Sequence, residues 1–179
     1  MIFRQLSEPI SNTYTYLLGC ETTGDALLID PVVISISRDL QVLQSLGLRL
    51  AYTLDTHIHA DHITAARHLK ERVSSKIAAP AVDRLPCVDV GIVEGTPFQL
   101  GGIRLDPLHT PGHTDGHFSY RCDDRLFSGD ALLIDGCGRT DFQKGDAATV
   151  SRRVPEKLTA RPAELLLYPS RDYRDPQLS

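Results

Sequence analysis

The chain has 179 residues, of which 41% are hydrophobic and 23% charged, and its formal net charge at pH 7 is −4. This profile is typical of a globular protein that buries one sizeable core, and it predicts a single domain over residues 1–179. The sequence has no block of basic residues and no apolar run long enough for a membrane span, so we expect no nucleic acid and no membrane as partner.

The first half of the chain predicts strands that alternate with helices. Short segments rich in Thr, Tyr, Leu and Ile are typical of strands, and apolar residues at helical spacing before Gly47 predict a helix that ends there. The expected elements are strands at 3–6, 13–18 and 26–29, a helix at 36–46, a strand at 48–54, a helix at 63–73 and a strand at 76–79. Residues 80–95 carry only a weak pattern, and we expect them to be irregular.

The second half predicts mainly strands. Gly101-Gly102 and Asp123-Asp124 are typical of hairpins, and Asp146 suits the N-cap of a helix. The expected elements are strands at 97–100, 103–108, 118–121 and 125–127, a helix at 146–158 and a strand at 165–168. Strand runs with helices between them predict two packed sheets covered by helices on both outer faces. The predicted fold is therefore α/β (α+β), with four layers in the order αββα.

The turn between the strand at 48–54 and the following helix is rich in metal-ligating residues. It holds His57, His59, Asp61 and His62 within six positions. Imidazole and carboxylate groups suit zinc, copper, iron or nickel, so this turn indicates a transition-metal site. Other residues of ligand type, His113 and Asp130, also follow strands, and all of them can meet only if those strand ends lie on one edge of the sandwich.

These residues resemble the motifs of the metallo-β-lactamase superfamily. The resemblance rests on the H-x-H-x-D-H turn from His57 to His62, on Pro111-Gly112-His113-Thr114 and on Ser128-Gly129-Asp130, in matching order and spacing. It implies the four-layer fold over almost the whole chain. It does not by itself imply one reaction, because lactamases, thioesterases, nucleases and oxygenases share this fold.

Three further segments look like the persulfide dioxygenase (sulfur dioxygenase) branch, which is similar to glyoxalase II. They are residues 13–18, residues 28–32 and, above all, residues 136–143, which read Gly-Cys-Gly-Arg-Thr-Asp-Phe-Gln. The resemblance implies oxidation of glutathione persulfide by O₂ to sulfite and glutathione. It also implies one non-haem Fe(II) per chain, held by His57, His113 and Asp130, with zinc as the alternative metal.

A second metal ion is disfavoured by Arg171. A dinuclear zinc centre would use Asp61, His62, a bridging Asp130 and a histidine near the C-terminus, where the family pattern has His and this chain has Arg171. Arginine has no lone pair for a metal and keeps its positive charge. We expect Arg171 to stand in for the second ion and to pair with Asp61; the alternative is a tail that swings away and leaves Arg171 in solvent.

Several neighbouring residues have expected supporting roles. We expect His59 beside the metal, and we expect Asp61 and His62 to orient the ligating imidazoles by hydrogen bonds. Arg139 and Tyr173 are candidate contacts for the substrate. The alternative for Arg139 is an internal salt bridge with Asp141 or Asp135. The remaining histidines, His68, His109 and His117, are expected to be structural.

The cysteines and the first residues indicate the compartment. Residues 1–6 lack the apolar segment of a secretory signal, and the 4 cysteines form no C-x-x-C pair. We therefore expect a cytoplasmic protein with reduced thiols, and we expect Cys20, Cys87, Cys122 and Cys137 to be buried.

Two other functions stay open on the sequence. A zinc-dependent thioester hydrolase of glyoxalase II type would use the same fold, and so would a catalytically silent binding or regulatory protein. Metal content separates the three hypotheses, because iron favours the dioxygenase, zinc the hydrolase and no metal the silent protein. The sequence also permits a homodimer.

Overall fold

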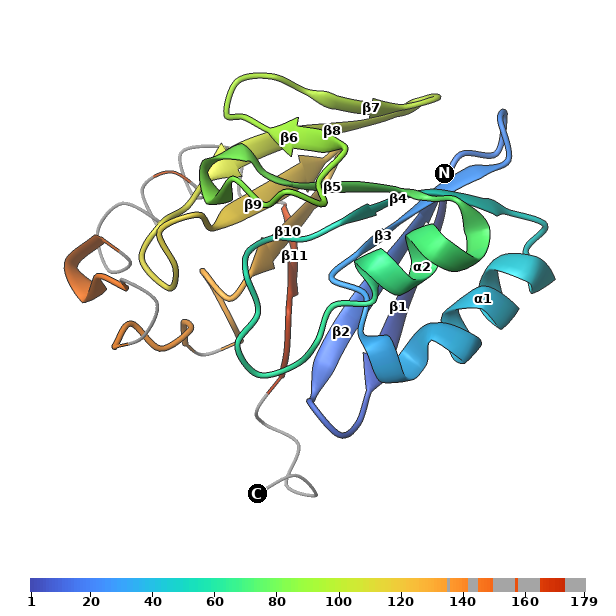
Figure 1. Ribbon diagram of the computed structural model, residues 1–179. Helices are drawn as coiled ribbons and strands as arrows, with labels where there is room; N and C mark the ends of the chain where they lie inside the picture. The colour runs from blue at the N-terminus through green and yellow to red at the C-terminus, as the bar shows by residue number, and fades with distance from the viewer. Residues whose placement is uncertain (135, 142–144, 150–156, 158–164, 173–179) are drawn as a thin grey trace.

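Figure 1 shows the chain as a computed structural model, which describes residues 1–134, 136–141, 145–149, 157 and 165–172. Within these residues the strands form two sheets that pack face to face. The first sheet has the order β1-β2-β3-β4-β5-β6 and the second the order β11-β10-β9-β8-β7. The strands are β1 Ile2–Glu8, β2 Thr13–Gly19, β3 Asp25–Ile29, β4 Arg49–Leu54, β5 Lys76–Pro80, β6 Val90–Ile92, β7 Phe98–Leu100, β8 Ile103–His109, β9 Phe118–Cys122, β10 Arg125–Gly129 and β11 Leu166–Pro169.

Two helices, α1 (Ile36–Ser45) and α2 (Ala66–Val73), cover the outer face of the first sheet (Figure 1). Short 3₁₀ turns lie at Val33–Ser35 and Ala81–Asp83. The helix expected at 146–158 lies mostly outside the described residues, but 147–149 and 157 are helical. Asp146 is its N-cap as predicted, because its carboxylate accepts hydrogen bonds from Ala148 N at 3.1 Å and from Thr149 Oγ1 at 2.5 Å.

Side chains that alternate along the central strands fill two separate cores. In β2, Tyr16 and Leu18 pack between the two sheets, whereas Leu17 packs beneath the helices. In β3, Leu27 points into the core between the sheets and Leu28 points to the helices. Both faces of these strands are therefore buried, which is why their sequence reads as a nearly continuous apolar run.

Two predicted elements differ from the structure. Helix α2 begins at Ala66 rather than at residue 63, because Ile63 accepts a backbone hydrogen bond from Val33 at 2.9 Å and Thr64 forms a β-bridge with Val32. Residues 90–92, predicted to be irregular, form β6 and pair in parallel with β5. A tertiary partner thus overrides a weak local pattern.

The functional residues follow strands whose carboxyl ends share one edge of the sandwich. In the first sheet β3 and β4 are parallel, and in the second sheet β10 and β11 are parallel. Strand β8 runs in the same direction as β10 because both are antiparallel to β9. The residues after these strands therefore meet at one place, as the sequence requires.

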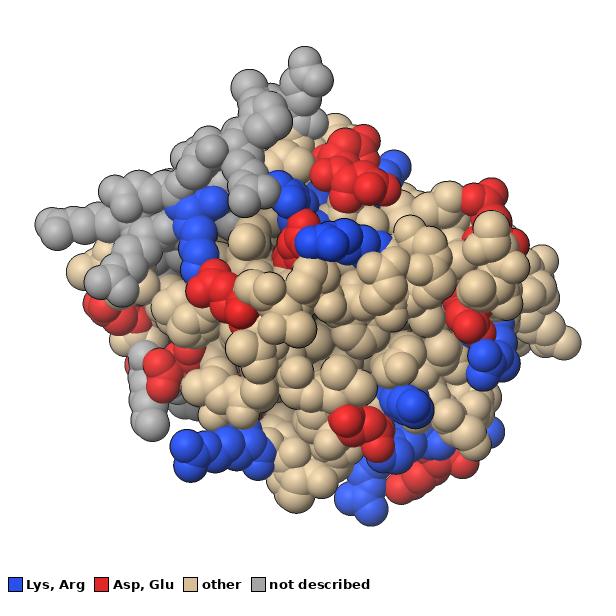
Figure 2. All heavy atoms as spheres, turned by 90° about the horizontal axis from the view of Figure 1, so that it is seen from above, with Lys and Arg blue, Asp and Glu red and all other residues tan. Residues whose placement is uncertain are grey.

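The structure also describes the surface and the four cysteines. No helix among the described residues is long and apolar enough to cross a membrane. On the face drawn in Figure 2, acidic and basic side chains are interspersed, and the described residues there form no continuous basic patch.

The burial expected of the cysteines is correct for Cys20 and Cys122 and wrong for Cys87 and Cys137, which are exposed. Both exposed cysteines lie in loops outside the sheets.

Candidate metal centre

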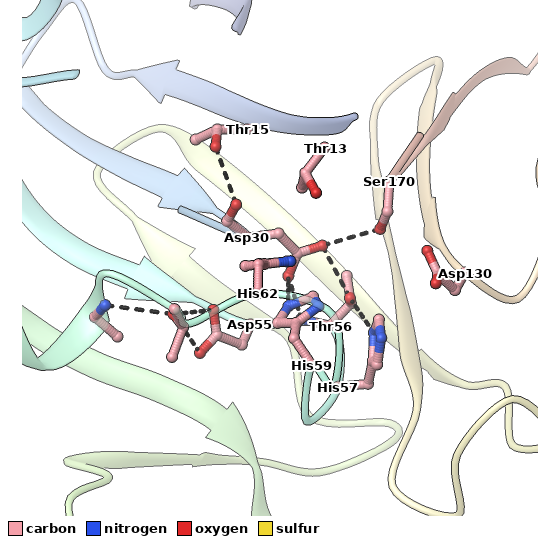
Figure 3. Close-up of polar contacts among 12 residues, drawn as sticks. Thr13, Thr15, Asp30, Asp55, Thr56, His57, His59, His62, Asp130 and Ser170 are labelled. Carbon is pink, nitrogen blue, oxygen red and sulfur yellow. Dashed lines mark hydrogen bonds and ion pairs between the residues drawn. The ribbon is translucent and has the colours of Figure 1, made fainter. Parts of the chain in front are cut away.

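The structure brings His57, His113 and Asp130 together. One ligand atom from each lies within 4.8 Å of the others, and Nε2 of His113 is 3.5 Å from Oδ2 of Asp130. His57 follows β4 and Asp130 follows β10, so the two sheets each supply part of the cluster (Figure 3). His57 and Asp130 are buried and His113 is partly buried.

A chain of hydrogen bonds sets the protonation of the His57 ring. The hydroxyl of Thr56 donates to Oδ2 of Asp30 at 2.9 Å and therefore accepts from Nδ1–H of His57 at 2.8 Å. Nε2 of His57 is left without a proton. Burial, followed by the neighbouring His59 and His117, holds the pKa of His57 well below its usual value, so the ring is neutral. A neutral imidazole with a bare Nε2 is the form that binds a metal.

His113 is oriented in a comparable way by the backbone. Its Nδ1 donates to the carbonyl oxygen of Arg139 at 2.7 Å, which leaves Nε2 to face Asp130. Both histidines of the cluster thus offer Nε2 as the ligand atom. The expectation that Asp61 and His62 would orient these rings is wrong: among the described contacts, Thr56 and the Arg139 carbonyl do so. Asp61 and His62 bond instead to each other at 2.9 Å.

Asp130 is held by a histidine that the sequence indicated only as structural. Nε2 of His117 accepts a hydrogen bond from the backbone N–H of Asp130 at 3.1 Å, and its Nδ1 bonds to Oγ1 of Thr110 at 2.9 Å. Burial is the main cause that lowers the pKa of His117 to about 3, so this ring stays neutral and can accept. No spacing motif in the sequence pointed to this role.

Asp30 is a second residue whose role the sequence did not reveal. Its carboxylate accepts from Thr56 N at 2.7 Å, and it contacts His59 Nε2 at 3.2 Å and Ser170 Oγ at 3.3 Å (Figure 3). Burial opposes ionisation of Asp30, but His59 and the hydrogen bonds outweigh it and lower its pKa. Asp30 has a positive φ of 49°. This backbone conformation at the end of β3 directs the Asp30 carboxylate toward the histidine turn.

The donor set fits a metal ion. Nε2 of His57 and Oδ1 of Asp130 are buried, and neither has a hydrogen-bond partner among the described residues. Leaving a buried polar atom without a partner costs about 1–3 kcal/mol, and a cation would satisfy both atoms. Two imidazole nitrogens and one carboxylate oxygen are the ligand set of mononuclear non-haem iron sites, and zinc accepts the same donors.

Arg171 lies where the pairing with Asp61 was expected. Its Nη2 is 2.6 Å from Oδ2 of Asp61 and its Nε is 3.5 Å from Oδ1 of Asp130. With only 6% of its surface exposed, Arg171 does not swing out into solvent. Burial opposes ionisation of Asp61, but His62 and Arg171 together outweigh it and hold the pKa of this carboxyl well below its usual range.

A cavity of about 520 Å³ opens in front of the cluster. Its lining includes Asp61, His113, Asp130, Cys137, Arg139 and Arg171. Arg139 is exposed and makes the alternative salt bridge with Asp141, through Nε to Oδ1 at 2.7 Å and Nη2 to Oδ2 at 2.8 Å. The other two residues named for this region, Asp135 and Tyr173, lie outside the described residues. The cavity therefore joins the metal cluster to two guanidinium groups.

Comparison with known proteins identifies the family. The model of the family described as "Metallo-beta-lactamase superfamily" matches residues 9–89 and 75–173. The chain belongs to this superfamily, in agreement with the predicted fold.

The chain is similar to enzymes of two related groups. The chain is 42% identical to "Persulfide dioxygenase ETHE1, mitochondrial" of Homo sapiens, over 97% of this chain and 69% of that protein. A crystal structure of ETHE1 from Myxococcus xanthus superposes with a TM-score of 0.94 at 46% identity, covering 98% of this chain and 77% of that one. A hydroxyacylglutathione hydrolase of Methylococcus capsulatus is 35% identical, over 92% of this chain and 64% of that protein. The resemblance to the persulfide dioxygenase branch is thus confirmed, with the hydrolases as more distant relatives.

Proposed function

We propose that this protein is a mononuclear non-haem iron dioxygenase that uses O₂ to oxidise glutathione persulfide to sulfite and glutathione. The observation that carries the proposal is the 42% identity to a persulfide dioxygenase over 97% of the chain. The geometry of the site supports it, because His57, His113 and Asp130 bring three donors together, and His113 and Asp130 line a cavity. The overall reaction is balanced when one water molecule supplies the third oxygen of sulfite.

Each residue of the proposed site has its own role. His57, His113 and Asp130 hold the ion, and a ferrous ion with this ligand set supplies the redox chemistry by which O₂ reacts with sulfur. Thr56 and the Arg139 carbonyl fix the two imidazole rings, and His117 fixes the backbone of Asp130. The protein thus contributes ligand geometry and a shaped cavity rather than an attacking nucleophile.

The cavity suits an anionic thiol carrier. Glutathione carries two carboxylates, and Arg139 lies at the cavity with a planar guanidinium that can bind one of them through two hydrogen bonds. Its present partner, Asp141, is 69% exposed, and an exposed pair of this kind contributes only about 0–1 kcal/mol. A substrate carboxylate can therefore replace Asp141. We also propose Tyr173, which lies outside the described residues, as a substrate contact.

One experiment separates this function from its alternatives. Iron-loaded protein is mixed with glutathione persulfide, while oxygen consumption and sulfite formation are followed together. The proposal predicts equal amounts of oxygen consumed and sulfite formed, with little hydrolysis of lactoylglutathione. Rapid hydrolysis of lactoylglutathione by the zinc-loaded protein without oxygen consumption would favour the glyoxalase II-type function. No turnover of either compound by metal-loaded protein would favour the silent member of the fold.

Three properties of the whole protein belong to the same proposal: its location, its cellular role and its assembly as a homodimer. We propose a cytoplasmic location, which fits four cysteines that form no disulfide, and a role in sulfide detoxification that follows from the reaction. Cell fractionation that finds it in a membrane or organelle would contradict the location. Unchanged sulfide tolerance in a deletion strain would contradict the role. A homodimer is tested by the mass of the protein in solution.

A further inference from the structure

The loop after β10 lies directly against two residues of the metal cluster. The backbone N–H of Gly138 donates a hydrogen bond to the carbonyl oxygen of Asp130 at 2.7 Å. The carbonyl oxygen of the next residue, Arg139, accepts a hydrogen bond from Nδ1 of His113 at 2.7 Å. Two successive residues of the loop therefore reach both ligands through backbone atoms alone, and these contacts do not depend on any side-chain rotamer of the loop.

The position of Gly138 leaves no room for a side chain. A Cβ atom at this residue would lie 2.6 Å from the carbonyl oxygen of Asp130, 2.7 Å from Nδ1 of His113 and 2.9 Å from Cβ of Asp130. Carbon atoms that are not bonded to each other prefer a separation of about 3.5–4.0 Å. The nearest of the three atoms belongs to the backbone and cannot rotate away. Glycine therefore permits an approach of the loop to the two ligands that a residue with a Cβ atom would prevent.

Gly136, two residues earlier, has different surroundings. It is exposed, and a Cβ atom there would meet no described atom within 4 Å beyond its chain neighbours. Its carbonyl oxygen accepts from the N–H of Leu133 at 2.8 Å, and these two residues form a β-bridge. Cys137, Gly138 and Arg139 then line the cavity in front of the metal cluster. The loop thus forms part of the cavity wall while its backbone contacts the ligands.

We propose that Gly138 is a positioning residue of the metal site, because its missing side chain lets the loop fix His113 and Asp130 relative to each other. Nε2 of His113 and Oδ2 of Asp130 are 3.5 Å apart, close enough for a metal ion to contact both. A larger residue would push the loop away from Asp130, and the Arg139 carbonyl would move with it. His113 would then lose the hydrogen bond that orients its ring. The inference rests on the metal site of the proposed function but not on the reaction there.

Cobalt binding tests this role, because the visible absorption bands of bound Co(II) depend on the geometry of its ligands. Metal-free proteins are titrated with Co(II) in competition with a chelator. Gly138→Ala should bind Co(II) about 10–100-fold more weakly than wild type, with shifted bands. Gly136→Ala is the matched control, because its methyl group enters open space in the same loop, and it should equal wild type in both measurements. Wild-type affinity and bands in Gly138→Ala would overturn the proposal.

A merely structural role of Gly138 would give a different result. Metal-free Gly138→Ala would then melt below wild type and still bind Co(II) with wild-type affinity, which contradicts the proposal. The same titration separates this inference from the proposed function. Wild type that binds no Co(II) would overturn the metal site and this inference with it, whereas equal affinities in wild type and Gly138→Ala would overturn the inference alone.

If Gly138→Ala does not fold, as judged by circular dichroism, amide hydrogen exchange in wild type provides the decision. Coupling between the loop and the bound ion is reciprocal, so an ion on His113 and Asp130 should also hold the loop in place. Zinc should therefore slow exchange of the Gly138 N–H by about 10-fold. The hydrogen-bonded N–H of Gly24, before β3 at the opposite end of the strand from the site, is the control and should change little. Equal exchange of the Gly138 N–H with and without zinc would overturn the proposal.

Discussion

Nη2 of Arg171 lies 2.6 Å from Oδ2 of Asp61, a residue 110 positions earlier in the chain. Asp61 belongs to the turn after β4 in the first sheet, and Arg171 follows β11 in the second. The contact therefore crosses the sandwich at the edge where the metal cluster lies. Because a guanidinium occupies this position, we expect one metal ion at the site.

Thr56→Val should weaken metal binding. The substitution removes the hydroxyl that joins Asp30 to His57 Nδ1, so the ring is no longer held in the form that presents a bare Nε2. Loss of such a supporting hydrogen bond costs about 10–100-fold in metal affinity. Competition with a chelator measures the change, and Thr56→Ser, which keeps the hydroxyl, should stay close to wild type. Unchanged affinity in Thr56→Val would remove Thr56 from this role.

His117→Leu should reduce both stability and metal affinity. The backbone N–H of Asp130 would lose its acceptor inside the core, at a cost of about 1–3 kcal/mol. For a chain of this length the melting temperature should fall by roughly 2–12 °C. His68→Gln, on the exposed surface of α2, is the control, and its melting temperature should equal that of wild type. Equal melting temperatures for the two variants would show that His117 supports nothing at the site.

Glu8 should make folding stability depend on pH. Its buried carboxylate accepts from Ile10 N at 2.9 Å and from Ser11 N and Oγ at 2.6 Å, in the turn between β1 and β2. Burial opposes its ionisation, but these hydrogen bonds outweigh burial and lower the pKa of Glu8. A lowered folded pKa adds stability above the unfolded pKa of about 4.3, and this stability is lost as the pH falls through the folded pKa.

Urea unfolding of Glu8→Gln measures this contribution. The variant should be less stable than wild type by about 1–2 kcal/mol at pH 7. The difference should shrink below pH 4, where wild type also becomes protonated. A difference that stays constant across this range would show that the charge of Glu8 contributes nothing.

Arg139→Ala should raise KM for glutathione persulfide and leave kcat nearly unchanged. Such a change is expected for a group that binds ground state and transition state equally. Asp141→Asn is the control, because it removes the charge of the partner and keeps the guanidinium, so KM should stay equal or fall. Neither variant should change stability by more than about 1 kcal/mol, since the pair is exposed. A fall in kcat without a change in KM would place Arg139 in the chemical step.

Much of the fold and the centre of the site could be predicted because they depend on local patterns. The strands at 13–18 and 26–29 are apolar on both faces, and the histidine turn follows a buried strand, so strand ends place His57 near Asp130. The pairing of Arg171 with Asp61 followed from charge complementarity at a position that the family pattern assigns to a ligand. Such inferences need only the order of strands and the chemistry of the residues.

The remaining contacts depend on tertiary approach, which no local pattern encodes. Asp30 reads as the end of a strand, and only the fold shows that Thr56, His59 and Ser170 converge on its carboxylate. The role of His117 depends on β9 lying beside β10, where its ring meets the backbone of Asp130. Strand β6 was not predicted for the same reason, because its three residues form a strand by pairing with β5 and not through a pattern of their own.

Activity measured during iron titration tests the central claim most directly. Metal-free protein receives increasing amounts of Fe(II) under anaerobic conditions, and each sample is then assayed for oxygen consumption with glutathione persulfide. If His57, His113 and Asp130 hold a single catalytic ion, the rate should rise in proportion to added iron and level off at one equivalent per chain. A rate that continues to rise until two equivalents, or one that zinc supports equally well, would contradict a mononuclear iron dioxygenase.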